Sequence, residues 1–332
     1  MESLLNTFSV GDNLELLKTL PNNSINCIYT DPIYCTGRDF HDYDDRFESI
    51  EHYKEFIDVR IKECHRVLKP DGVIIVHVEP RISHIHRVVL DKYFGFKKFV
   101  NEIVWKTGGN AKNKNKLGRQ HDTIIVYSKN AKYKFHSIYK PYDEKYMKSS
   151  RPKMCDHHKK LYVTTAAHNA KPDVNPRLNL RYNWKGHDKQ WYMTLDKMKE
   201  LDEDHRLEYN KNGIPRIKRF IDDMDGIPVT DWFDDISNTQ NGEKLDYATQ
   251  KPRALLDRLL KLFTDENDVV LDIFAGSGTV GRSCIALKRQ YILFDISEKA
   301  KRIFEESIKN DGDGEDDEDE EVDEASTSAS TA

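Results

Sequence analysis

Continuous apolar runs that alternate with helical patterns constrain the fold of this chain more than any other feature. The runs occupy residues 25–29, 73–76, 268–274 and 291–294, and residues between them, as in 50–68 and 255–263, repeat apolar side chains at helical spacing. Strands buried on both faces read as near-continuous apolar runs. Strands that alternate with helices build a parallel sheet covered on both sides. The sequence therefore predicts a doubly wound α/β fold with a mainly parallel sheet.

The first of these runs leads into a motif that carries polar chemistry, Asp31-Pro32-Ile33-Tyr34. Ligands of open α/β sheets bind at the carboxyl ends of the strands. There the Asp31 carboxylate and the Pro32 carbonyl can accept the two hydrogens of an exocyclic amine on a flat heterocycle. Tyr34 can stack on the ring of that heterocycle. The same residues also fit a simple strand-ending turn, because Asp-Pro is common in turns. Taken alone, the motif leaves both interpretations open.

A glycine-rich segment after a later run is the second candidate site. Gly276, Gly278 and Gly281 match the G-x-G-x-x-G dinucleotide fingerprint, and Asp295 ends the next apolar run. Glycines allow close approach of the backbone to a ligand, and an acid at the next strand end can hold ribose hydroxyls. Asp272, just before the glycines, suits a cationic ligand better than a pyrophosphate. Only strand-helix-strand-helix remains in this region, too little for a second nucleotide-binding half, which argues against a nicotinamide cofactor.

Charge is distributed very unevenly along the chain. Residues 106–219 hold 27 Lys+Arg against 12 Asp+Glu, whereas residues 311–332 hold 11 Asp+Glu and no Lys or Arg. The basic segment suggests contact with a polyanion, and its aromatic residues can either stack on bases or form the core of a small domain. The loop with Lys112, Lys114, Lys116 and Arg119 is the predicted nucleic-acid-binding stretch. The acidic tail is predicted to be disordered.

Other sequence features favour an intracellular protein without a metal site. No apolar run reaches the roughly 18 residues of a membrane helix, and no signal-peptide pattern is found. We therefore expect a soluble, cytoplasmic protein with no membrane partner. The five cysteines are odd in number and scattered, which argues against disulfides. Cys155, His157, His158 and His168 match no paired zinc spacing, so no metal is predicted. The chain has no Gly-x4-Gly-Lys-Ser/Thr loop for ATP.

Five segments in this order resemble the amino-methylating DNA methyltransferases that use S-adenosylmethionine. They are most similar to the β-ordered group, which includes modification subunits of type III restriction systems. The likeness covers roughly residues 8–130 and 240–308. The matching segments are Gly11-Asp12-Asn13-Leu14, Thr30-Asp31-Pro32-Ile33-Tyr34-Cys35-Thr36-Gly37, Asp44-Asp45-Arg46-Phe47, Thr249-Gln250-Lys251-Pro252 and Leu271-Asp272-Ile273-Phe274-Ala275-Gly276-Ser277-Gly278-Thr279.

The resemblance implies a permuted methyltransferase domain with an insertion. Residues 1–106 would form the catalytic half, 107–235 a basic target-recognition region with one core strand near 121–128, and 236–310 the cofactor-binding half, before the tail at 311–332. Asp31, Pro32 and Tyr34 would hold the target base. The residues expected to bind S-adenosylmethionine are Asp12, Lys251, Pro252, Asp272, Phe274, Gly276, Gly278, Thr279 and Asp295.

The implied activity is methyl transfer from S-adenosylmethionine to the N6 amine of a flipped-out adenine in DNA. Asp rather than Ser at the first motif position favours adenine. Cytosine-N4 methylation, an RNA substrate and a catalytically weak cofactor- or nucleic-acid-binding subunit are the alternatives. A homodimer or a separate restriction subunit would fit the family as a partner.

The chain departs from the family motif at two positions. The second proline of the family is Ile33, and the asparagine that commonly follows the tyrosine is Cys35. Isoleucine does not fix φ as proline does, so the loop is expected to be less rigid. Because Asp31, Pro32 and Tyr34 are intact, activity is still expected.

Overall fold

The computed structural model describes residues 2–37, 45–108, 115, 117–174, 176–239, 243–247 and 249–313. It divides into two compact units. The first contains Met1–Ser137 together with Thr230–Ala332, and the second contains Ile138–Val229. The second unit covers fewer residues than the range 107–235 that was expected for the inserted region. Within the described ranges, no helix is long and apolar enough to cross a membrane.

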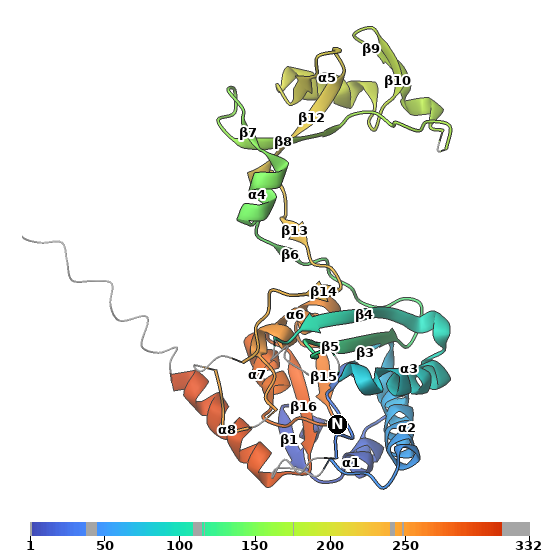
Figure 1. Cartoon of the computed structure of the whole chain (residues 1–332), viewed down its shortest axis with the longest axis vertical. Coiled ribbons are helices and arrows are strands. Elements are labelled where there is room, and N and C mark those ends of the chain that lie inside the picture. The colour runs from blue at the N-terminus through green and yellow to red at the C-terminus, as the bar shows by residue number, and fades with distance from the viewer. Residues whose placement is uncertain are drawn as a thin grey trace, which may run out of the picture. The chain divides into compact units, whose positions relative to one another are not determined.

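A mainly parallel sheet forms the centre of the first unit (Figure 1). Strand β5 is the exception, since it runs antiparallel to both of its neighbours, β3 and β4. The expected fold class, an α/β domain with a mainly parallel sheet, is confirmed. Across the sheet the strands follow the order β1 (Thr7–Val10), β16 (Gln290–Asp295), β15 (Val269–Asp272), β2 (Ile25–Thr30), β3 (Leu68–Val78), β5 (His121–Ser128), β4 (Phe99–Lys106) and β14 (Trp232–Phe233).

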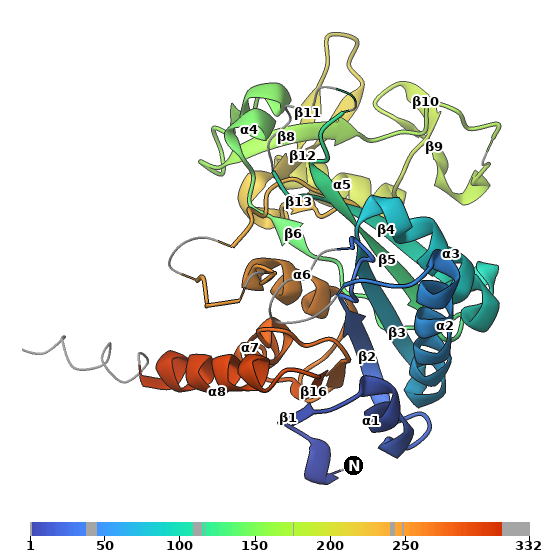
Figure 2. The same cartoon turned by 60° about the horizontal axis from the view of Figure 1, so that its bottom comes forward.

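Helices cover both faces of this sheet (Figures 1 and 2). One face carries α1 (Asn13–Thr19), α2 (Ile50–Val67) and α3 (Pro80–Phe94). The other carries α6 (Arg253–Phe263), α7 (Thr279–Ala286) and α8 (Glu298–Asp313). Short 3-10 turns lie at Glu2–Leu4, Phe96–Lys98, Leu178–Leu180 and Ile221–Asp223, the last two in the second unit.

Helix α2 shows how the sequence pattern produces this layer. The Ser49 side chain accepts from the His52 N–H at 3.1 Å, which satisfies one of the free donors at the helix start. Tyr53, Ile57 and Ile61 are buried on the face toward the sheet, in one core with residues of β2 and β3. Burial of apolar side chains at helical spacing supplies most of the stability of such a helix.

The structure corrects two expectations about element ends. Residues 69–72, expected only to stop α2, belong to β3, because the ladder between β2 and β3 shifts register between the pairs Ile25–Leu68 and Cys27–Val73. A bulge of this kind accommodates extra residues in one strand. Helix α8 runs to Asp313, three residues into the segment expected to be disordered. Residues 314–332 lie outside the described residues.

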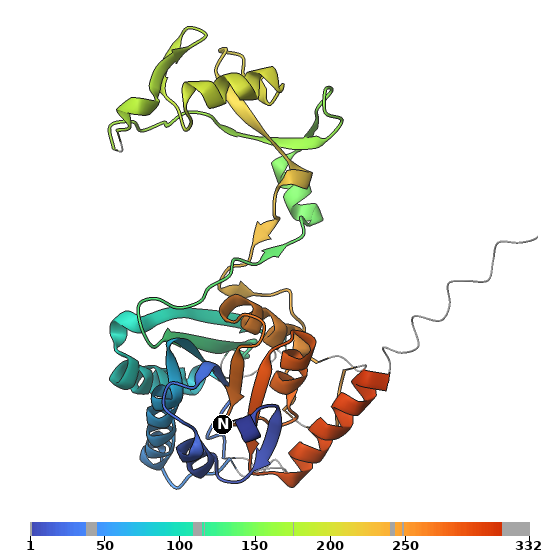
Figure 3. The same cartoon turned by 180° about the vertical axis from the view of Figure 1, so that it is seen from behind.

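The second unit is a small α+β body with its own core (Figure 3). Trp184 and Trp191 are buried there with Met198 and Leu201 of α5, so these tryptophans serve packing and do not stack on bases. Tyr192 is exposed. The elements are β6 (Tyr139–Lys140), α4 (Glu144–Ser150), β7 (Lys153–Met154), β8 (Leu161–Ala166), β9 (Arg181–Trp184), β10 (His187–Gln190), α5 (Leu195–Glu203), β11 (Leu207–Tyr209), β12 (Pro215–Phe220) and β13 (Ile227–Pro228).

Candidate active site

A cavity of about 390 Å³ lies in the first unit at the carboxyl ends of β1, β2, β15 and β16. Both motifs predicted from sequence open into it. This is where an open α/β sheet binds ligands, and the volume is in the range of small-molecule sites. The predicted site residues that line it are Asp12, Asp31, Pro32, Tyr34, Lys251, Asp272, Phe274, Gly276, Thr279 and Asp295.

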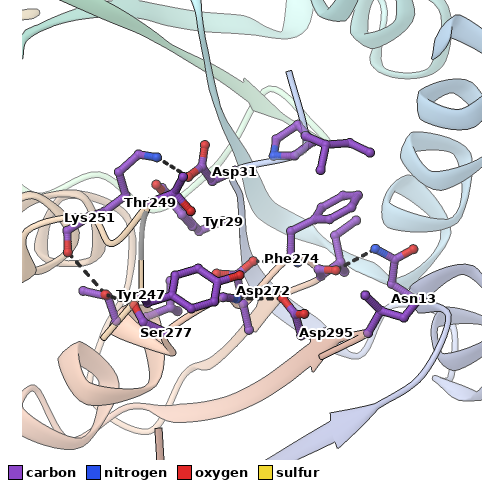
Figure 4. A pocket seen from close by; sticks show the side chains of 18 of the residues that line it. Asn13, Tyr29, Asp31, Tyr247, Thr249, Lys251, Asp272, Phe274, Ser277 and Asp295 are labelled. Carbon is purple, nitrogen blue, oxygen red and sulfur yellow. Dashed lines mark hydrogen bonds and ion pairs between the residues drawn. The ribbon is translucent and has the colours of Figure 1, made fainter. Parts of the chain in front are cut away.

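The Asp31 carboxylate is held by two side chains of the cavity. Figure 4 shows its ion pair with Lys251. The Tyr34 hydroxyl donates to its Oδ1, and the Lys251 ammonium pairs with its Oδ2. Burial, followed by the charge of Asp31, raises the pKa of Tyr34, so the phenol remains protonated and donates. Lys251, expected in the cofactor pocket, thus also contacts the predicted base-binding carboxylate. A carboxylate has about four acceptor positions, so Asp31 keeps capacity for a further donor.

A buried polar chain stands behind this group. Tyr29, which lines the cavity, has its hydroxyl 2.9 Å from His77 Nδ1, and His77 Nε2 is 3.3 Å from Asp122. Asp122 in turn pairs with Arg119 at 3.2 Å, and Arg119 also pairs with Glu79. The half-exposed Arg119 therefore has acidic partners of its own. The other predicted nucleic-acid contacts, Lys112, Lys114 and Lys116, lie outside the described residues.

Asp272 is a buried acid of the cavity, 2% exposed. Its Oδ1 accepts from the Phe274 N–H at 3.0 Å. Burial raises the pKa of Asp272 well above its ordinary value, the Phe274 N–H opposes the shift, and the charges of Asp31 and Asp295 add to it. Lys251 lowers the pKa. A carboxyl group in this environment gains from a neighbouring cation, which favours its ionised form.

The backbone of the glycine segment packs closely against neighbouring residues. Gly278 has a φ of +74°, and a Cβ placed there would lie 2.3 Å from the Phe304 ring of α8. Only glycine fits both conditions. Asp295 accepts from the Gly276 N–H at 2.8 Å and from the Ser297 N–H at 3.0 Å. Gly278 and Pro252 lie outside the cavity lining, as the N-caps of α7 and α6.

Several residues of the site were not predicted from sequence. One of them is Arg60 of α2, which lies 3.3 Å from the predicted site residue Asp12. Asp12 itself caps α1 by accepting from the Leu14 N–H at 2.7 Å. Arg60 also donates to Asn13 at 2.6 Å, and its guanidinium lies 3.5 Å from the centre of the Phe56 ring. An arginine on the otherwise apolar buried face of α2 was the signal for Arg60. Asn13 and Asp45 stand in segments that match the family, whereas the cavity residues Tyr29, Phe56 and Tyr247 had no such signal.

These donors and acceptors fit S-adenosylmethionine. Asp272 can supply negative charge beside the positively charged methionine part, and Asp295 can accept from ribose hydroxyls. A Cβ on Gly276 would lie 3.0 Å from the Tyr247 ring, so a side chain at this position would crowd the wall of the cavity.

The second unit offers no comparable cluster. Cys155 Sγ lies 3.4 Å from His158 Nδ1. In the part of the chain that the structure describes, no three His, Cys, Asp or Glu side chains are grouped to hold a metal ion.

Comparison with known families decides how this site is to be understood. The model of a DNA methylase family, the N6/N4 methyltransferases, matches residues 25–306. The chain belongs to this family. One curated relative is the Mod subunit of the type III restriction-modification enzyme StyLTI of Salmonella typhimurium, which is 26% identical over 88% of this chain and 52% of the subunit. Another is the type II methyltransferase M.EcaI of Enterobacter cloacae, 28% identical over 89% of this chain and 67% of that protein. The chain thus spans about half the length of the Salmonella subunit.

Solved structures share the fold of this chain. A DNA modification methylase of Thermus thermophilus, crystallised with S-adenosylmethionine, has a TM-score of 0.50 at 18% identity and covers 91% of this chain and 93% of its own. The cytosine-N4-specific PvuII methyltransferase has a TM-score of 0.52 at 16% identity over 92% and 90%. The expected family, fold and cofactor class are confirmed. These likenesses leave the choice between adenine N6 and cytosine N4 open.

Proposed function

We propose that this protein transfers a methyl group from S-adenosylmethionine to the N6 amine of adenine in DNA. The observation that carries the proposal is the meeting of the two predicted motifs at one cavity, with the Asp31 carboxylate between Tyr34 and Lys251. The preference for adenine rests on the resemblance, through Asp at the first motif position.

The target amine needs acceptors because its lone pair is delocalised into the ring. Asp31 and the carbonyl of Pro32 would accept its two hydrogens and thereby localise the lone pair. Among the described hydrogen bonds, none ends on the Pro32 carbonyl. A base in duplex DNA must first leave the stack, and Tyr34 lines the cavity where the ring would lie. Correct alignment of amine and methyl group is the main contribution required of the protein.

The cofactor would be held by residues from both ends of the chain. Asp272 and Lys251 would face its methionine part, Asp295 its ribose and Asp12 its adenine. When bound, S-adenosylmethionine supplies a methyl group already activated by the positive sulfur. No strong base is then needed before attack, and the proton is lost from the amine after transfer.

The test is methylation of unmodified genomic DNA by the purified protein with radioactive S-adenosylmethionine, followed by nucleoside analysis. N6-methyladenine supports the proposal. N4-methylcytosine would correct the base, and methylation of RNA alone would replace the substrate. Asp31→Ala should abolish transfer while cofactor affinity, measured by calorimetry, stays within about threefold. Full transfer by Asp31→Ala would contradict the proposed role of this carboxylate.

We also propose that the second unit, Ile138–Val229, contributes target recognition. Its support is its position in the chain between the two motif groups, which is the position of the recognition region in the resembling family. A homodimer or a separate restriction subunit is the partner expected from the family, and sedimentation of the purified chain tests the first.

A further inference from the structure

Six backbone groups of the loop at residues 32–37 form hydrogen bonds to residues outside it. The carbonyl of Ile33 accepts from the Tyr53 hydroxyl at 3.0 Å. The carbonyls of Tyr34 and Cys35 both accept from Arg81, at 3.1 and 2.9 Å. Three successive carbonyls are therefore occupied, next to the Pro32 carbonyl that the proposed function requires for the base.

The amide side of the same loop converges on one carboxylate. Asp45 accepts from the Cys35 N–H at 2.7 Å, from the Thr36 N–H at 2.9 Å and from the Thr36 hydroxyl at 2.6 Å. Its own carbonyl accepts from the Gly37 N–H at 3.3 Å. Asp45 is 1% exposed, so its carboxylate is committed to this loop. A buried carboxylate that accepts several backbone N–H groups forms strong, charge-assisted bonds.

These contacts hold a backbone that its own sequence favours poorly. Ile33 lacks the ring by which the family proline fixes φ. Cys35 adopts a φ of +52°, in the left-handed region that asparagine enters more readily than cysteine. Both departures from the family motif thus lie in the segment that Asp45, Tyr53 and Arg81 hold.

The Tyr53 side chain is itself held in place by its neighbours. It is fully buried, and its hydroxyl lies 2.8 Å from His86 Nε2. Burial, with the charge of His84 adding, lowers the pKa of His86 to about 3, so His86 is neutral and can donate to Tyr53 while Tyr53 donates to Ile33. Phe47 packs edge-on against the Tyr53 ring at 5.0 Å. Asp45 and Phe47 both come from the third motif, Asp44-Asp45-Arg46-Phe47.

We propose that Asp45 and Tyr53 are positioning residues for methyl transfer. They restrain the Asp31–Tyr34 segment, as the second proline of the family motif would otherwise do. They act through the loop and do not touch the reacting groups. This inference rests on the proposed function, because it needs Asp31 and the Pro32 carbonyl to receive the target amine. The Tyr53 bond replaces the restraint at Ile33, and the Asp45 carboxylate holds the left-handed Cys35.

The test compares Asp45→Asn, Tyr53→Phe and the control Asp58→Asn in the full-length protein. Asp58 lies on the same helix as Tyr53, but its partners are Lys92 and Tyr93 on α3. Asp45→Asn and Tyr53→Phe should each lower kcat by about 10- to 100-fold, the scale of a misplaced reacting group. Cofactor affinity should remain within about twofold by calorimetry, because the cofactor motifs are unchanged. Asp58→Asn should change neither quantity.

Rescue by proline distinguishes positioning from general damage. None of the bonds found among described residues uses the Ile33 N–H, so Ile33→Pro removes no donor in use. Ile33→Pro combined with Tyr53→Phe should recover at least fivefold of the lost kcat. Normal kcat in both single variants, or loss without any recovery by proline when circular dichroism shows a native fold, would overturn the inference. A wild-type protein without methyl transfer would instead contradict the proposed function.

Discussion

At the scale of single residues, Lys251 links the two halves of the site. Its ammonium pairs with Asp31, its carbonyl accepts from the Thr279 hydroxyl at 3.2 Å, and its charge lowers the pKa of Asp272. Lys251→Met should lower kcat by about 100-fold, because Asp31 loses the group that orients it. The pKa of Asp272 should rise further without this cation. Its ionised form then requires higher pH, so the acidic limb of the activity profile should move to higher pH.

The measurement is the pH profile of kcat for wild type, Lys251→Met, Lys251→Arg and the control Lys261→Met, an exposed lysine on α6. Arginine should restore part of the rate, since it keeps the charge. An unshifted acidic limb in Lys251→Met would show that Lys251 does not act on Asp272.

Cys35 gives a second prediction at this scale. Because its φ is +52°, Cys35→Asn should stabilise the protein by about 0.5–1 kcal/mol. Lys288→Asn is the matched comparison, since Lys288 has a φ of +57° at the end of α7. Both should raise the thermal midpoint, and only Cys35→Asn should affect kcat. A lower thermal midpoint for Cys35→Asn alone would show that the contacts of the cysteine stabilise the protein by more than the backbone strain destabilises it.

At the scale of elements, α8 is packed against the glycine turn that precedes α7. A Cβ on Gly278 would lie 2.3 Å from the Phe304 ring, at a φ of +74°. Gly278→Ala should destabilise the protein by about 2–4 kcal/mol, through strain together with overpacking. Gly95→Ala is the control: φ is +85° there, but a Cβ meets no atom within 4 Å. Its ψ of +140° lies outside the left-handed helical region, so the substitution should cost only the backbone part, about 1–3 kcal/mol.

Urea unfolding of both variants separates the two contributions. Equal losses would show that Phe304 moves aside without cost.

The buried His86 between α3 and α2 predicts a pH dependence of stability. Its pKa is lowered to about 3 in the folded protein from 6.5. Between these values the unfolded chain binds the extra proton, so stability falls as pH falls below about 6.5, by roughly 1.4 kcal/mol per pH unit. Above that pH the histidine is neutral in both states and contributes no slope.

His86→Gln cannot titrate, yet its amide can still donate to Tyr53. Urea unfolding at pH 7 and pH 5 should therefore show the variant gaining about 2 kcal/mol relative to wild type on acidification. Parallel losses in the two proteins would mean that His86 is protonated in the fold without penalty.

The sequence predicted these elements unevenly. Apolar runs and helical spacing located β2, β15, β16, α2 and α6, because burial on both faces of the sheet leaves a clear pattern. The antiparallel direction of β5 and the bulge in β3 depend on pairing between distant segments, which no local pattern records. The site shows the same division. Asp31 and Gly276 stand in motifs, whereas Tyr53 and Phe56 reach the site only because helix α2 folds over the sheet.

At the scale of the whole molecule, the positive charge is divided between the two units. Residues 106–137 of the first unit hold eight Lys+Arg and one Asp, and the second unit holds 19 Lys+Arg and 14 Asp+Glu. Attraction of DNA through phosphates depends on such charge and carries no sequence information. The basic stretch of the first unit can therefore attract DNA without the second unit, and selectivity for a site is the contribution expected from the second.

Deletion of residues 138–229 tests this division. The Val229 N–H donates to the Ile138 carbonyl at 2.9 Å, so the two ends of the second unit lie together and a short Gly-Ser linker can replace it. The shortened protein should bind S-adenosylmethionine as wild type does, because every residue of the cavity belongs to the first unit. It should still bind DNA weakly, and this affinity should depend less steeply on salt concentration. The slope of log affinity against log salt should fall by about 0.9 for each phosphate that the protein no longer neutralises. Site-specific methylation, read by mapping modified bases, should disappear. Methylation of the same sites at the wild-type rate would show that target recognition belongs to the first unit.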